Sequence, residues 1–118
     1  MSITDNIAPD LSKILLETYR LLATHGLDGA SDVPAGAVPL RLREAMKIAV
    51  GANPNDFMVF MTLWQRDGVV GGMSALSARF EQFYPHEDNF SLWLAESATT
   101  ANVLDLIANV LADDEVQP

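Results

Sequence analysis

The sequence contains no cysteine, so it forms neither a disulfide framework nor a thiolate site. No apolar run is long enough to span a membrane. Residues 1–9 lack the positive and apolar regions of a signal peptide. These absences exclude disulfide-rich scaffolds and thiol enzymes, and we expect a cytoplasmic protein that does not enter a membrane.

Basic residues are scarce and unevenly placed. Seven Lys and Arg stand against 16 Asp and Glu, for a net charge of −9. No Lys or Arg occurs in residues 80–118, which hold eight carboxylates. Phosphate groups would be repelled by this charge, so direct binding to nucleic acid or to an anionic membrane is disfavoured. A basic or neutral protein partner is favoured instead.

The composition is that of a globular chain, with 49% hydrophobic and 19% charged residues. At 118 residues we expect one domain covering 1–118, in which residues 1–9 are typical of a mobile arm. No internal repeat and no convincing strand alternation appears. The expected fold is all-α: a compact bundle of about five helices, with the longest helix C-terminal.

Helix signals divide the first half of the chain. An amphipathic helix is predicted over residues 10–25, with Asp10 favouring its start and Gly26 its end. After a loop, Pro39 suits the first turn of a second helix over residues 40–50. Asn53 then suits the N-cap of a third helix.

We expect the third helix to end near Gly68, because Gly68–Gly72 has the composition of a flexible joint. A short extended piece within this segment is an alternative. A fourth helix is predicted over residues 74–84, and Pro85 cannot continue it.

The last helix is predicted over residues 91–112 as one continuous element. Its apolar residues would then cover an arc of roughly 240°, where a surface helix needs an apolar stripe of about 100° or somewhat more. Two interpretations are open. The helix is central and surrounded by its own chain, or one side packs on the core while the other binds a second subunit or a partner.

Candidate catalytic or metal-binding residues are few. His25 suits the negative end of the first helix, and His86-Glu87-Asp88 are consecutive residues that rarely converge on one ion. Gly68–Gly72 lacks the spacing and the lysine of a phosphate-binding loop, and no serine lies in a GxSxG elbow. We therefore expect no enzyme activity, no metal and no cofactor.

The expected function is binding to another protein. Aromatic and Met side chains at helical spacing are typical of an adaptable apolar contact surface. We predict a homodimer, with dimer and partner contacts shared among residues of the third and last helices: Phe57, Phe60, Met61, Trp64, Val103, Ile107 and Val110.

The chain resembles the small acidic quorum-sensing anti-activators. The resemblance spans the full length and rests on residues 11–20, on the aromatic segment 56–64 and on the acidic C-terminus. It implies a compact helical protein that binds a LuxR-type transcription factor. It further implies inhibition by covering the surface that the regulator needs for dimerisation, so that the regulator no longer binds DNA.

Two other classes of function remain. An acidic chain can mimic nucleic acid for a DNA-binding protein, or serve as a small adaptor or chaperone-like protein. A small enzyme or ligand-binding domain is disfavoured by the missing constellation of catalytic residues, although a pocket with a perturbed carboxylate would favour it.

Overall fold

A computed structural model describes residues 10–51 and 62–116, with side chains as far as Ala112. Within these ranges the chain forms helices and no strand, which confirms the all-α prediction. The longest helix is α4, so the expectation of a longest C-terminal helix is wrong. The five helices are α2 (Leu11–His25), α3 (Leu42–Ala49), α4 (Leu63–Phe83), α5 (Phe90–Glu96) and α6 (Thr100–Val116).

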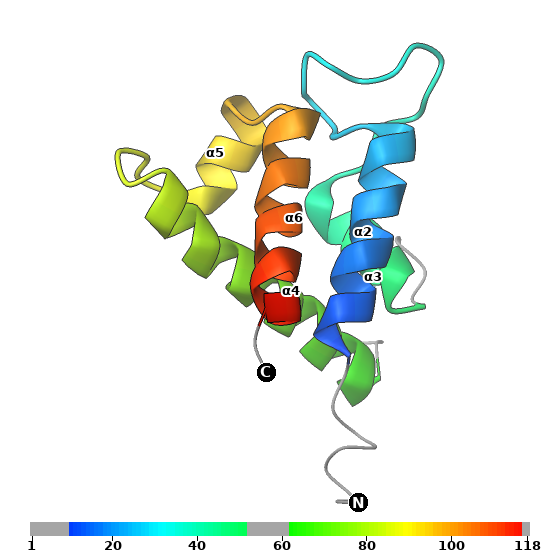
Figure 1. Ribbon diagram of the computed structural model, residues 1–118. Helices are drawn as coiled ribbons and strands as arrows, with labels where there is room; N and C mark the ends of the chain where they lie inside the picture. The colour runs from blue at the N-terminus through cyan, green and yellow to red at the C-terminus, as the bar shows by residue number, and fades with distance from the viewer. Residues whose placement is uncertain (1–9, 52–61, 117–118) are drawn as a thin grey trace, which may run out of the picture.

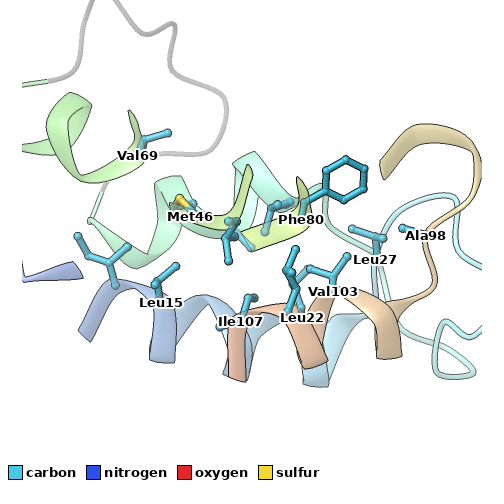
Figure 2. Packing of buried hydrophobic residues seen from close by; sticks show 14 of the residues in the cluster. Leu15, Leu22, Leu27, Met46, Val69, Phe80, Ala98, Val103 and Ile107 are labelled. Atoms are coloured by element: carbon cyan, nitrogen blue, oxygen red, sulfur yellow. The ribbon is translucent and has the colours of Figure 1, made fainter. Parts of the chain in front are cut away.

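Helices α2 and α6 lie side by side and run antiparallel, and α4 passes behind both (Figure 1). α3 packs against α2 and α4, and α5 packs against α4. The core fills the space between these helices, where side chains from α2, α3, α4 and α6 point toward one another (Figure 2). Its largest fully buried hydrophobic side chains are Leu22, Leu27, Met46, Leu76, Leu106 and Ile107.

The boundaries of α2 are those expected from its sequence. Asp10 accepts a hydrogen bond from the Lys13 backbone N–H at 3.2 Å and so caps the first turn. Gly26 ends the helix with φ of +85°, and a Cβ there would lie 2.8 Å from Cδ of Pro34. Glycine is therefore required for both backbone conformation and space.

The second helix begins later than predicted, at Leu42 rather than residue 40. Leu40 instead pairs with the segment after α2: its N–H donates to the Gly26 carbonyl at 2.9 Å, and its carbonyl accepts from Asp28 at 2.8 Å. This bridge keeps Pro39 outside the helix. Glu44 then caps α3 by accepting from the Arg41 N–H at 3.0 Å.

The predicted joint at Gly68–Gly72 is wrong, because these residues lie inside the continuous helix α4. A Cβ on Gly72 would lie 2.5 Å from Sδ of Met46, and one on Gly71 would lie 3.1 Å from Cδ2 of Leu11. The glycines thus permit α4 to approach α3 and α2 closely. Packing of these neighbouring side chains offsets the poor helix propensity of glycine.

The start of α4 also differs from the prediction. Thr62 and Gln65 form a capping box, in which Thr62 Oγ1 accepts from the Gln65 N–H at 3.2 Å and Gln65 Oε1 accepts from the Thr62 N–H at 2.9 Å. A helix begins here, nine residues after the predicted N-cap Asn53, which lies outside the described residues.

The predicted single helix over residues 91–112 is broken into α5 and α6. The Trp93 carbonyl accepts from the N–H groups of both Ser97 and Ala98, which ends α5. Thr99 and Asn102 then cap α6 reciprocally, at 3.0 and 3.1 Å. Because Trp93 and Leu94 belong to a different helix from residues 101–111, the arc of roughly 240° combines two separate faces.

An acidic residue in the α2–α3 loop completes the start of α6. The two carboxylate oxygens of Asp32 accept from the backbone N–H groups of Thr100 at 2.7 Å and Ala101 at 3.0 Å. Thr100 Oγ1 in turn accepts from the Leu27 N–H at 2.9 Å. These contacts join segments about seventy residues apart and hold the loop against α6.

Aromatic stacking fixes α5 on the end of α4. The Phe80 ring lies 5.0 to 5.5 Å, between centroids, from the rings of Tyr84, Phe90 and Trp93. Trp93 is buried in this cluster. Its aromatic contacts hold α5 against α4, although α5 is only seven residues long.

Gly72→Ala should destabilise the protein by about 1 kcal/mol, since overpacking against buried Met46 outweighs the gain in helix propensity. Gly71→Ala is the matched control: half-buried Leu11 can shift, so this variant should be neutral or slightly stabilised. Urea unfolding followed by circular dichroism measures both. Equal effects of the two substitutions would contradict the close contact at Gly72.

Asp32→Asn should cost about 1 kcal/mol at neutral pH, because one charge-assisted hydrogen bond to α6 is lost. The Thr100 and Ala101 N–H groups hold the pKa of Asp32 below its ordinary value of 3.8. A lowered folded-state pKa stabilises the protein above pH 3.8, and this stabilisation is lost as pH falls through the folded value.

The stability difference between wild type and Asp32→Asn should therefore shrink in acid, as measured by urea midpoints at neutral pH and at about pH 3. Asp67→Asn removes the same charge from an exposed position on α4 and serves as the control. A difference that stays constant with pH would show that the Asp32 carboxylate does not stabilise the start of α6.

Candidate interaction surface

The structure separates the seven residues predicted to form an interface. Phe57, Phe60 and Met61 lie outside the described residues. Trp64 lies in the first turn of α4, where 38% of its surface is exposed. The remaining three residues are on α6.

Val103 and Ile107 are completely buried in the core, and Val110 is half-buried against it. Figure 2 shows the first two pointing into the core, toward side chains of the other helices. Neither is accessible to a partner in this fold. The last apolar segment was predicted either to be surrounded by its own chain or to face a partner on one side. For Val103 and Ile107, the structure shows the first arrangement.

Helix α4 carries exposed apolar residues that were not among the predicted interface residues. Leu63 is 75% exposed and Val70 is 55% exposed. They are seven residues apart, so they lie on the same side of the helix, and Trp64 lies at the edge of this side. We refer to Leu63, Trp64 and Val70 as the α4 outer strip.

The sequence contained a signal for this strip. A helix that continues through Gly68 puts Leu63 and Val70 in register, whereas a predicted joint separates them. Gly72 lies on the opposite side of α4, against Met46 of α3 and Leu15 of α2, so Leu63 and Val70 face outward.

A second exposed surface is acidic. Glu87, Asp88 and Glu96 line a shallow cavity of about 90 Å³ together with Leu92, which is 55% exposed. We refer to these four residues as the α5 acidic face. It belongs to the part of the sequence without Lys or Arg, so no basic side chain within residues 80–118 offsets its charge. Its field favours a basic partner.

The candidate metal-binding residues remain dispersed. His25 is half-buried in the last turn of α2, and His86 is exposed in the turn between α4 and α5. Among the side chains of residues 10–51 and 62–112, no group of three or more His, Asp or Glu is placed to hold a metal ion. In the same part of the chain, none of the helices is both long and apolar enough to cross a membrane.

Comparison with protein-family models, curated proteins and solved structures finds no match for this chain. The resemblance to quorum-sensing anti-activators therefore stays a prediction. The exposed residues of the described chain define the candidate interaction surface.

Ile107→Glu should abolish cooperative folding or lower the free energy of unfolding by about 4 kcal/mol or more, because it places a charge in the core. Ala108→Glu adds the same group one position further on, where the side chain is exposed, and should leave the unfolding midpoint nearly unchanged. Thermal unfolding measures both. A stably folded Ile107→Glu variant would return this residue to the list of surface contacts.

Proposed function

We propose that this protein is a non-enzymatic regulator that acts by binding another protein. The observation that supports this most directly is the α4 outer strip, in which Leu63 and Val70 project apolar surface from a helix anchored in the core. Trp64 beside them is the residue type most often found at the centre of energetically important contacts. Rigid support lowers the entropic cost of using such a surface for binding.

The proposed mechanism is steric. The α4 outer strip docks on the apolar surface that the partner uses for its own assembly, and the partner then cannot assemble. The α5 acidic face adds long-range attraction to basic groups, which affects orientation and association rate more than affinity.

The proposed partner is a LuxR-type transcription factor in the cytoplasm. The resemblance to quorum-sensing anti-activators supports this choice, and the net charge of −9 supports a basic, DNA-binding partner. The protein would cover the dimerisation surface of the regulator and so prevent DNA binding. We further propose that it acts as a homodimer, as predicted from its apolar helices.

A second candidate function is mimicry of nucleic acid. The α5 acidic face supports it, since three exposed carboxylates gather there beside exposed Leu92. In this case the protein would occupy the DNA-binding surface of its partner rather than the dimerisation surface.

Fluorescence anisotropy of labelled operator DNA bound to a purified LuxR-type regulator tests both functions. Wild-type protein should release the DNA. Combined Leu63→Glu and Val70→Glu substitutions should raise the concentration needed by about thirtyfold, the effect of losing roughly 2 kcal/mol at a central apolar contact. Gln82→Glu adds one charge at the other, exposed end of α4 and should behave as wild type.

Ionic strength separates the two candidates. Steric inhibition through apolar contacts should depend only weakly on salt, whereas mimicry of DNA should collapse between about 50 and 200 mM salt. Inhibition by the double variant equal to that of wild type would show that the α4 outer strip is not the contact surface. Failure of the wild type to release DNA at any concentration would refute sequestration of this regulator.

A further inference from the structure

A cavity of about 400 Å³ opens between α3, α4, α5 and the loop that follows α2. This volume lies within the range of about 300 to 1,000 Å³ typical of small-molecule sites. Its apolar lining includes buried Leu27 and Leu42 and half-buried Met73 and Leu94. Each comes from a different element, so the cavity is formed by the tertiary fold and not by one helix.

Three charged side chains are part of the cavity lining. Arg41, Arg43 and Asp28 all line it, so two of the seven basic residues of this acidic chain lie at one site. Nε of Arg41 lies 3.6 Å from Oδ2 of Asp28, which balances one of the two positive charges. Arg43 makes no ion pair with a carboxylate in the described part of the chain and is exposed. The lining therefore carries one uncompensated positive charge.

The beginning of α3 adds to this field. Leu42 and Arg43 belong to its first turn, where backbone N–H groups have no acceptor within the helix and carry partial positive charge. Glu44 is the nearest carboxylate of that turn, and it is directed to the Arg41 backbone N–H. Helix polarity and the Arg43 guanidinium thus favour an anion at the same place.

Hydrogen bonds hold the loop side of the cavity in place. The Leu27 N–H donates to Thr100 Oγ1 at 2.9 Å, and the Asp28 N–H donates to the Leu40 carbonyl at 2.8 Å. A cavity that is formed before the ligand arrives costs little conformational entropy on binding. Because its shape is fixed, the cavity favours one class of ligand more strongly than a general apolar surface would.

We propose that this cavity binds a small amphipathic monoanion: a carboxylate that carries an apolar chain. The apolar lining contacts the chain, and the carboxylate pairs with Arg43 at the beginning of α3. At roughly 30 Å³ per water-sized group, the space holds on the order of a dozen such groups. A single negative charge matches the single uncompensated positive charge. This site is separate from the α4 outer strip and does not depend on the proposed function.

Titration of the full chain with octanoate, followed by ¹H–¹⁵N correlation NMR, tests the proposal. Backbone signals of Gly29, Arg43 and Ala95 around the cavity should shift and saturate. 1-Octanol, which has the same chain without the charge, should bind at least about tenfold more weakly. Acetate, which has the charge without the chain, should produce no saturating shift.

Two variants locate the ligand. Arg43→Gln should weaken octanoate binding by about tenfold, the loss expected for one charge-assisted hydrogen bond. Ala95→Trp places a large side chain into the cavity from an exposed position and should abolish binding while the spectrum stays that of a folded protein. Arg20→Gln removes the same charge from α2, outside the cavity, and should leave the affinity unchanged.

Three results would overturn the proposal. They are the absence of saturable octanoate binding, equal affinity for 1-octanol and octanoate, or equal effects of Arg43→Gln and Arg20→Gln. Loss of octanoate binding in a folded Ala95→Trp variant would establish that the apolar chain of octanoate lies in the cavity. A selective effect of Arg43→Gln would establish where its carboxylate binds.

Discussion

The close approach of α4 to α2 and α3 at Gly71 and Gly72 is the contact on which the rest of the fold depends. Without a Cβ at Gly72, the buried side chain of Met46 lies directly against the α4 backbone. This fixes which side of α4 faces inward. The opposite side, with Leu63 and Val70, is then left in solvent. The close packing of Met46 on Gly72 therefore determines both the core and the position of the α4 outer strip.

A second constraint acts at the other end of the bundle. Asp32 and Thr100 tie the loop after α2 to the beginning of α6, over a separation of about seventy residues. The same loop supplies Leu27 and Asp28 to the cavity. Hydrogen bonds that cap a helix therefore also hold a wall of the cavity, so the shape of that site depends on the stability of the fold around it.

Charge is distributed unevenly over this scaffold. The α5 acidic face lies in the stretch without basic residues, whereas Arg41 and Arg43 lie at the cavity. The two regions favour partners of opposite charge, a basic protein at one and a small anion at the other. The α4 outer strip is uncharged, so an apolar contact there does not conflict with attraction of a basic partner by the α5 acidic face.

Elements whose signals are local could be predicted correctly from the amino-acid sequence. Asp10 and Gly26 mark both ends of α2, and the apolar periodicity predicts an all-α chain, because capping and amphipathicity act over three to four residues. The remaining features depend on contacts between segments that are distant in the sequence. Glycine ends a helix or lets another helix approach, depending on what packs on it, and Met46 settles that at Gly72. The break before Thr100 is stabilised by Asp32 from another part of the chain. Periodicity likewise marks Val103 and Val70 equally as apolar, and the neighbouring helices alone determine that the first is buried and the second exposed.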